Sequence, residues 1–209
     1  MKVLVITLAV VIFDQVSKVM VKGFSIPVLN FQYKGMYPGQ KIQILGDFFR
    51  LTFVENPGMA FGFDPGMDFK SLISIFSIVA SIALLIYIYY SRKQMLSLRI
   101  ALAFILGGAI GNLIDRIFYG VFYNYAPLFY GKVVDFLDFD FFNITIFGRS
   151  YDRWPVFNFA DSAVTIGILV LLFFYRKGSK EEKTAVGESG SQEPLNAGDQ
   201  QPRSDIKNF

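Results

Sequence analysis

The stretch FNFADS, residues 157–162, stands at the head of an apolar run that continues to Tyr175. An aspartate at the edge of the hydrocarbon layer of a membrane costs roughly 2.5–3.5 kcal/mol to insert. A second acidic motif, VVDF at residues 133–136, lies upstream. A chain that keeps acids at such a cost is expected to use them, so Asp135 and Asp161 are the first candidates for function.

The composition indicates an integral membrane protein. The 209 residues are 53% hydrophobic and 17% aromatic, and the apolar residues fall in long blocks. The net charge of +3 is small and dispersed, with no basic stripe of the kind that nucleic acid requires. Nucleic-acid binding is therefore set aside, and the lack of cysteine excludes a disulfide framework.

Four segments are long enough to cross a bilayer, at about 20 residues each. The first resembles the start of a cleavable signal peptide, but no small-x-small cleavage site follows, so we expect a retained helix. No repeat relates the two halves of the chain. The four segments run approximately from Val3 to Val21, Ser71 to Tyr90, Leu98 to Phe118 and Val156 to Tyr175.

Basic residues near the helix ends predict the orientation. They crowd the connection between the second and third segments and the region after the fourth, so we expect both termini in the cytoplasm and residues 22–70 and 119–155 outside. Residues 178–209 are rich in Gly, Ser, Glu, Gln and Pro and predict a disordered cytoplasmic tail after a single membrane domain, 1–177. The basic residues are Lys2, Arg92, Lys93, Arg99, Arg176, Lys177 and Lys180.

The outer segments carry β-strand signals. Residues 41–54, KIQILGDFFRLTFV, alternate in polarity around Gly46-Asp47, which predicts a hairpin, and residues 138–149 have similar β character. The predicted fold class is a membrane all-α protein of four transmembrane helices, with a small extracytoplasmic β-sheet lying on the membrane surface.

The sequence contains no histidine and no cysteine. Ser-His and Cys-His nucleophiles and zinc held by His or Cys are therefore unavailable. Among common hydrolytic devices, a pair of carboxylates that activates water is the main one left. We accordingly expect no metal and no cofactor.

Polar residues interrupt the third and fourth segments. In GGAIGNLIDR, residues 107–116, Gly107 and Gly111 allow another helix or a substrate backbone to approach, and Asn112, Asp115 and Arg116 gather on one side. Asn158, Asp161 and Thr165 share a face of the fourth segment. A polar cluster that joins helices is the alternative to a functional site, although an ionisable aspartate suits that purpose poorly.

Two further motifs have two readings each. Asp14 and Lys18 are spaced i, i+4, so they form either a structural ion pair or a site in which Asp14 faces a polar cavity. Asn56-Pro57-Gly58 is a turn signal, or else Asn56 and the backbone at Gly58 bind an extended peptide. For the whole chain, a transporter with acids through the membrane depth and a structural membrane subunit are the rival functions.

The order of these motifs resembles bacterial lipoprotein signal peptidase (signal peptidase II) over roughly residues 1–176. The matching motifs are Asp14…Lys18, Asn56-x-Gly-x-Ala-Phe, Gly-Asn112-x-x-Asp115-Arg116, Val-Val-Asp135-Phe and Phe-Asn158-x-Ala-Asp161. The stretches 116–135 and 139–157 are longer here than in compact members of that family.

The resemblance implies an aspartic intramembrane endopeptidase with an extracytoplasmic β-cradle. Such enzymes remove the signal peptide from a prolipoprotein, immediately before its diacylglyceryl-modified cysteine, at the outer face of the bacterial cytoplasmic membrane. It also implies contact with membrane lipids, a monomer, and cyclic lipopeptide inhibitors of the globomycin type. The catalytic pair maps onto Asp135 and Asp161, and the substrate-binding or supporting positions onto Asp14, Lys18, Asn56, Gly58, Asn112, Arg116 and Asn158.

Overall fold

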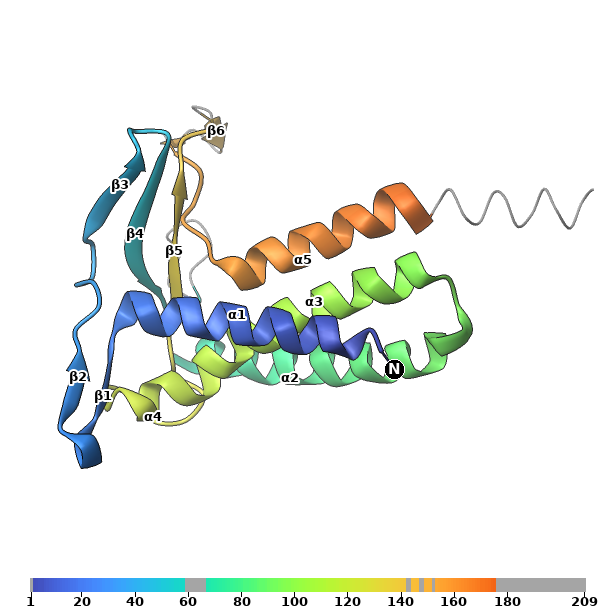
Figure 1. Ribbon diagram of the computed structural model, residues 1–209, viewed down its shortest axis with the longest axis horizontal. Helices are drawn as coiled ribbons and strands as arrows, with labels where there is room; N and C mark the ends of the chain where they lie inside the picture. Colours follow the sequence, from blue (N-terminus) through green and yellow to red (C-terminus); the bar gives the residue numbers. More distant parts are fainter. Residues whose placement is uncertain (1, 59–66, 142–143, 147–148, 152, 176–209) are drawn as a thin grey trace, which may run out of the picture.

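A computed structural model describes residues 2–58, 67–141, 144–146, 149–151 and 153–175. The long helices run side by side, and all the strands gather at one end of them (Figure 1). The expected tail, residues 178–209, lies outside the described residues. The long helices are α1 (Leu4–Lys22), α2 (Met67–Tyr90), α3 (Leu96–Ile114) and α5 (Phe159–Val170).

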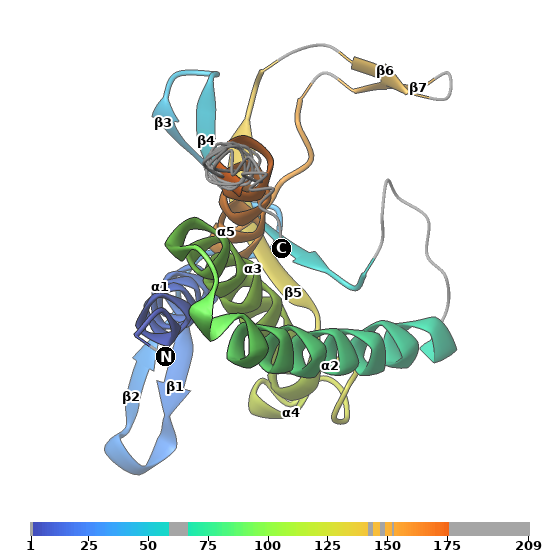
Figure 2. The same cartoon turned by 90° about the vertical axis from the view of Figure 1, so that its right-hand side faces the viewer.

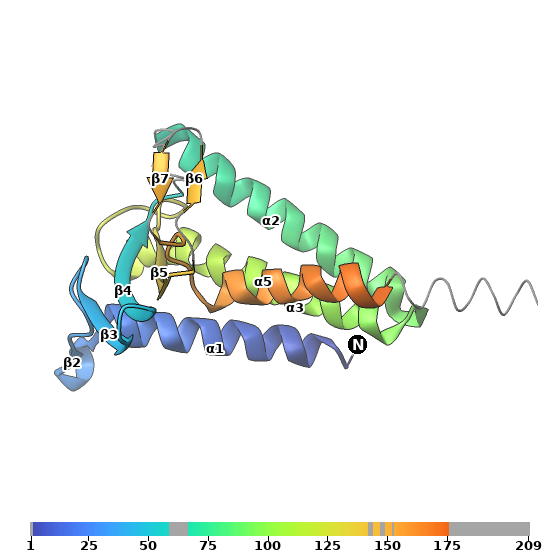
Figure 3. The ribbon, with the colours of Figure 1, turned by 90° about the horizontal axis from the view of Figure 1, so that it is seen from above.

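Helix α3 is central and contacts each of the other three long helices (Figure 2). Helix α2 diverges from α1 toward the end that carries the strands (Figure 3). The close approach predicted for Gly107 and Gly111 is confirmed. A Cβ on Gly107 would lie 2.8 Å from Cβ of Val10, and one on Gly111 would lie 2.6 Å from Oδ2 of Asp14, so both glycines admit α1.

Three described helices are long and apolar enough to cross a membrane: Leu4–Lys22, Ser71–Lys93 and Leu96–Phe122. The fourth predicted span is present as a shorter apolar helix, Phe159–Phe173, so helix length alone supports three crossings among the described residues. Apolar side chains cover the outer faces of the helices, with Val5 68% and Phe76 73% exposed, as expected of surfaces that face lipid. The protein is a multi-pass membrane protein.

The end of α3 continues without a break toward the strands. A π-helical turn, Asp115–Tyr119 (η3), follows α3 and leads into the short α4, Gly120–Phe122. A second π-helical turn, Leu171–Tyr175 (η4), follows α5. Such turns shift the register of side chains around a helix, and the first one carries Asp115 and Arg116.

An antiparallel sheet of order β3-β4-β5 stands across the strand-bearing end of the helices (Figure 1). Its strands are β3 (Lys41–Leu45), β4 (Phe49–Asn56) and β5 (Val133–Phe139). The predicted hairpin over residues 41–54 is confirmed by β3 and β4. The second β region begins earlier than predicted, because β5 starts at Val133 and so includes Asp135.

Two small hairpins complete the outer structure. The pair β6 (Ile144–Ile146) and β7 (Arg149–Tyr151) falls largely within the predicted β region. The pair β1 (Phe24–Ile26) and β2 (Phe31–Tyr33), joined by a 3₁₀ turn at Pro27–Leu29 (η1), was not expected. Between the sheet and the helix ends lies an apolar core of Val21, Phe53, Tyr119, Val134, Phe136 and Leu137.

Candidate active site

The start of α5 fixes the position of Asp161. Asn158 is the N-cap, and its Oδ1 accepts a hydrogen bond from the backbone N–H of Asp161 at 3.0 Å. In return, Oδ2 of Asp161 accepts one from the backbone N–H of Asn158 at 3.1 Å. Hydropathy had predicted that this helix begins at Val156. The reciprocal capping box explains why α5 begins instead at Phe159. It also holds the Asp161 carboxylate at the helix end.

Asp135 reaches the same asparagine from the sheet. It lies in β5 opposite Val54, and the chain before α5 runs beside β5 through a bridge between Leu137 and Phe157. Asn158 Nδ2 donates to Asp135 Oδ1 at 2.6 Å, and Asn56 Nδ2 donates to Oδ2 at 3.0 Å. Asn158 therefore bonds both aspartates, which are 26 positions apart in the sequence.

The electrostatic state of Asp135 differs from that of an ordinary aspartate. Burial, followed by the negative charge of Asp161, raises the pKa of Asp135 from 3.8 to about 7, although hydrogen bonds from Asn56 and Asn158 act in the opposite direction. A carboxyl group with a pKa near 7 retains a proton at neutral pH for a large fraction of the time. The site can therefore present one neutral and one ionised carboxyl group together.

Asn112 connects the aspartates to a buried lysine. Its Nδ2 donates to Asp161 Oδ1 at 2.8 Å, while its Oδ1 accepts from Asn158 Nδ2 at 3.0 Å and from Lys18 Nζ at 2.8 Å. Because Lys18 can only donate, it fixes which end of the amide is the acceptor. The donor end must then face Asp161.

Lys18 forms the centre of a buried ion-pair cluster. Its Nζ lies 2.8 Å from Asp14 Oδ2 and 2.9 Å from Asp115 Oδ2, and all three side chains are fully buried. The structural ion pair, rather than an Asp14 facing a cavity, is therefore confirmed. The partner of Asp115 is Lys18, on α1, and this contact was not predicted.

The two acids of this cluster also hold the backbone beside the site. Asp14 Oδ1 accepts a hydrogen bond from the backbone N–H of Ala160 at 2.9 Å, and Ala160 directly precedes Asp161. Asp115 Oδ2 accepts from the backbone N–H of Val134 at 3.2 Å, and Val134 directly precedes Asp135. The cluster thus links both candidate catalytic segments to α1 and α3.

Gln15 belongs to the same cluster and was missed in the sequence. Its Nε2 donates to Asp115 Oδ1 at 2.8 Å and to the Gly111 carbonyl at 3.0 Å, and its Oε1 accepts from the Tyr119 hydroxyl at 3.2 Å. The only available signal was an amide next to Asp14 within an apolar segment.

The remaining predicted residues lie around this centre. Arg116 interacts electrostatically with Asp115, Asp161 and Asp135. Within the described residues, no side chain forms a hydrogen bond with its guanidinium. The turn reading of residues 56–58 is confirmed, since Asn56 Oδ1 accepts from the Gly58 N–H at 2.9 Å and Gly58 has a φ of +95°.

Thr165 does not join the cluster, because its hydroxyl donates to the Asp161 carbonyl within α5. Among the residues that the structure describes, no three acidic side chains are arranged as ligands of a metal ion. Side-chain and backbone amides donate hydrogen bonds to Asp135 and Asp161, which suits carboxyl groups that act on a proton rather than on a metal.

The fold and this site define a membrane protein that holds two carboxyl groups against one asparagine where the helices meet the sheet. The family model "Signal peptidase (SPase) II" matches residues 6–176. The chain belongs to the signal peptidase II family, and it is a peptidase that removes signal peptides from prolipoproteins.

Individual relatives agree with this assignment. A lipoprotein signal peptidase of Pelodictyon phaeoclathratiforme is 37% identical over 172 residues, which cover 82% of this chain and 88% of the relative. One of Moorella thermoacetica is 38% identical over 168 residues, covering 80% and 88%. A solved structure of a bacterial membrane enzyme, determined by the in meso method, is 30% identical with a TM-score of 0.56, covering 82% of this chain and 90% of that one. The transporter and structural-subunit alternatives are thereby set aside.

Proposed function

We propose that Asp135 and Asp161 are the catalytic pair of an aspartic endopeptidase that cleaves a prolipoprotein immediately before its diacylglyceryl-modified cysteine. The observation that carries the proposal is Asn158, which donates to Asp135 through Nδ2 and forms a capping box with Asp161. An amide between two acids holds both in fixed positions while leaving each free to exchange a proton.

The raised pKa of Asp135 assigns the starting proton. Asp135 begins neutral, and Asp161 begins as the carboxylate whose charge contributes to that raised pKa. Asp161 removes a proton from a bound water, whose oxygen attacks the scissile carbonyl carbon. Asp135 donates its proton toward the carbonyl oxygen as negative charge develops there.

The tetrahedral intermediate then collapses. The proton taken up by Asp161 passes to the nitrogen of the leaving amine, the C–N bond breaks, and Asp135 recovers a proton from the former carbonyl oxygen. The leaving amine becomes the new N-terminus at the lipidated cysteine. The new carboxyl group ends the released signal peptide, and the pair returns to its starting state.

The neighbouring polar residues support this pair. Asn112 and Asn56 orient one carboxyl group each, through the bonds to Asp161 and Asp135. Asp14 and Lys18 are positioning residues, since they act through Ala160 and Asn112. Arg116 supplies positive charge near both acids. The Gly58 N–H is bonded to Asn56, so an extended peptide would be bound at Gly58 through the carbonyl group.

The proposed membrane placement follows the same geometry. We propose that α5 is the fourth crossing, that both termini are cytoplasmic, and that the sheet lies at the outer surface of the bacterial cytoplasmic membrane. The basic connection at Ser91–Lys93 supports this orientation. A substrate anchored by its acyl chains in the outer leaflet then reaches the pair from the bilayer. A monomer and inhibition by globomycin-type cyclic lipopeptides remain predictions.

The test is cleavage of a lipidated prolipoprotein by the purified protein carrying Asp135→Asn, Asp161→Asn or both. Each single change should abolish cleavage while binding of a substrate-like lipopeptide persists. The double variant should be scarcely worse than either single one, because the two groups act as a unit. A single variant that binds and still cleaves near the parental rate would refute the assignment.

A further inference from the structure

The β1–β2 hairpin is amphipathic. In its register Phe24 pairs with Tyr33, Ser25 with Gln32, and Ile26 with Phe31, so aromatic and aliphatic side chains share one face and Ser25 and Gln32 share the other. The tip is also apolar, with Val28 95% and Leu29 70% exposed. An exposed apolar tip and face on so small a hairpin are typical of an element that meets another surface.

This hairpin starts where the first membrane helix ends. Helix α1 finishes at Lys22, and β1 begins two residues later at Phe24. The hairpin extends from the end of α1 in the direction opposite to β3, β4 and β5, across the long axis of the helices (Figure 1). An element that leaves a transmembrane helix sideways at its end lies at the depth of the lipid headgroups.

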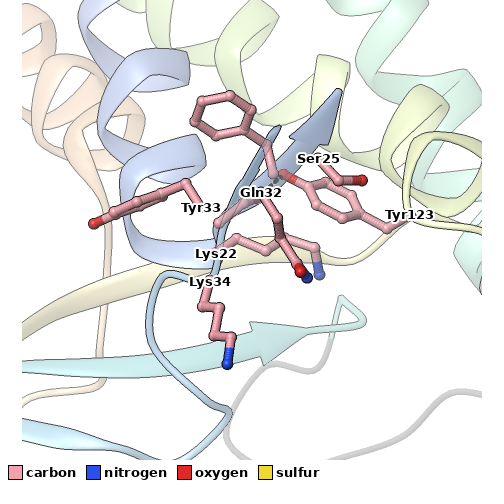
Figure 4. Close-up of a pocket in the computed structure, with 8 residues that line it drawn as sticks. Lys22, Ser25, Gln32, Tyr33, Lys34 and Tyr123 are labelled. Carbon is pink, nitrogen blue, oxygen red and sulfur yellow. Dashed lines mark hydrogen bonds between the residues drawn. The ribbon is translucent and has the colours of Figure 1, made fainter. Parts of the chain in front are cut away.

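A pocket opens between this hairpin and α4. Its volume is about 170 Å³, and its polar lining comprises Lys22, Ser25, Gln32, Lys34 and the Tyr123 hydroxyl. Figure 4 shows the side chains of Lys22 and Gln32 extending toward Tyr123, Lys34 extending downward below them, and Tyr33 pointing the other way. Since a water molecule occupies about 30 Å³ of the liquid, the pocket has room for a phosphate ester.

The charges around the pocket sum to a positive value. Lys22 pairs with Glu55 and stacks over the Tyr123 ring at 4.4 Å, and Lys132 reaches the other Glu55 oxygen at 3.1 Å. Although burial acts in the opposite direction, Lys22 and Lys132 hold the pKa of Glu55 below its usual value, so Glu55 is ionised at neutral pH. Together Lys22, Lys34 and Lys132 carry three positive charges and Glu55 carries one negative charge, which leaves two positive charges.

Lys34 is the cation that remains available. It is exposed, and no described acidic side chain forms an ion pair with it. Tyr123 is held in place by donating to the Gly23 carbonyl at 2.9 Å, and burial raises its pKa to about 12, so it adds no negative charge. The pocket therefore presents the Lys34 ammonium group, the Ser25 hydroxyl and the Gln32 amide to an anion, while the Tyr123 hydroxyl is occupied by the Gly23 carbonyl.

We propose that this pocket binds the phosphate of an anionic phospholipid, whose acyl chains pack against the apolar face and tip of the β1–β2 hairpin. Lysines bind phosphate as point charges, and a cation near an anionic membrane surface strengthens binding about fivefold. The pocket is separate from the Asp135–Asp161 site. The proposed lipid binding follows from the position of the pocket at the end of α1 and not from the catalytic assignment. It would hold the sheet and the end of α1 at a fixed depth in the bilayer.

The experiment uses the full chain reconstituted in bilayers, with Trp154→Phe and Tyr33→Trp placing the single tryptophan on the apolar face of the hairpin beside the pocket, where the acyl chains of a bound lipid would pack. Brominated lipids quench a tryptophan that they contact, so titration with brominated phosphatidylglycerol or phosphatidylcholine gives their relative affinities. We expect phosphatidylglycerol to be preferred about fivefold. The change Lys34→Gln should remove that preference, and the matched control Lys41→Gln, an exposed lysine on β3 outside the pocket, should retain it.

Three results would overturn the proposal. The first is equal quenching by both lipids in the parent, and the second is a preference that Lys34→Gln leaves unchanged. The third is a preference abolished by millimolar inorganic phosphate or glycerol phosphate, which would make the pocket a site for free phosphate rather than for lipid. None of these results requires a measurement of cleavage activity, so this test is independent of the catalytic assignment.

Discussion

Replacing Asp135 by asparagine isolates the free-energy cost of ionising a buried acid. Asp135 is 3% exposed, and burial together with the charge of Asp161 raises its pKa from 3.8 to about 7. Between these values the unfolded chain has lost a proton that the folded protein keeps, so the free energy of unfolding falls as the pH rises. At about 1.4 kcal/mol per pKa unit, the total loss is about 4 kcal/mol by neutral pH.

In the Asp135→Asn variant the side chain at position 135 is uncharged at every pH, so the free energy of unfolding does not fall with pH on its account. Its amide places an NH2 group where one carboxylate oxygen accepts from Asn56 or Asn158, which costs about 1–3 kcal/mol at every pH. The difference in stability between variant and parent should therefore shift in favour of the variant from pH 4 to pH 7 and stay constant above that. For a chain of this length the shift in Tm is about 10 °C.

The assay is thermal unfolding of both proteins in the same detergent from pH 4 to pH 8. Asp161→Asn serves as a second comparison, because removing that charge leaves only burial to raise the pKa of Asp135 and should weaken the pH dependence. A Tm difference between Asp135→Asn and the parent that is the same at pH 4 and pH 8 would refute a protonated, buried Asp135.

Further outcomes concern the residues around the pair. Lys18→Met should destabilise the protein by about 3–5 kcal/mol, because it leaves Asp14 and Asp115 buried without a cation; Asp115→Asn, which keeps the Asp14–Lys18 pair, should cost less, and equal losses of Tm would contradict this. Arg116→Lys should lower the cleavage rate about tenfold, because a point charge cannot replace a planar guanidinium; a parental rate and Tm would make Arg116 an ordinary surface charge. A strong chelator should leave the cleavage rate unchanged, and a loss restored by one added metal would contradict the two-carboxylate mechanism.

Local patterns in the sequence predicted the parts of the fold that local forces determine. Long apolar blocks identified the helices, and alternation around Gly46-Asp47 identified the β3–β4 hairpin. The i, i+4 spacing of Asp14 and Lys18 offered their ion pair as one of two interpretations, and the structure shows the pair. The β1–β2 hairpin was missed although its alternating Phe-Ser-Ile and Phe-Gln-Tyr triplets flank a turn, because three-residue strands give too weak a periodic signal.

The order of the acidic and asparagine motifs was sufficient to nominate Asp135 and Asp161, by resemblance to a family. It could not show that Asp135 lies on a strand, nor that Asn158 bonds both acids. Those contacts depend on β5 pairing with β4 and on the bridge between Leu137 and Phe157, which join segments separated by many residues. Hydropathy and spacing carry no information about which distant strands pair.

By itself, the sequence determined a multi-pass membrane protein with two candidate acids and no thiol or imidazole chemistry, because composition and hydropathy depend on the residues present. Only the tertiary structure decided that Lys18 pairs with Asp115, that Gln15 joins them, and that Asp14 and Asp115 hold the backbone beside Asp161 and Asp135. Each of these contacts crosses between helices, or from a helix to the sheet. A buried charge is stable only where packing brings it a partner, and packing is a property of the whole fold.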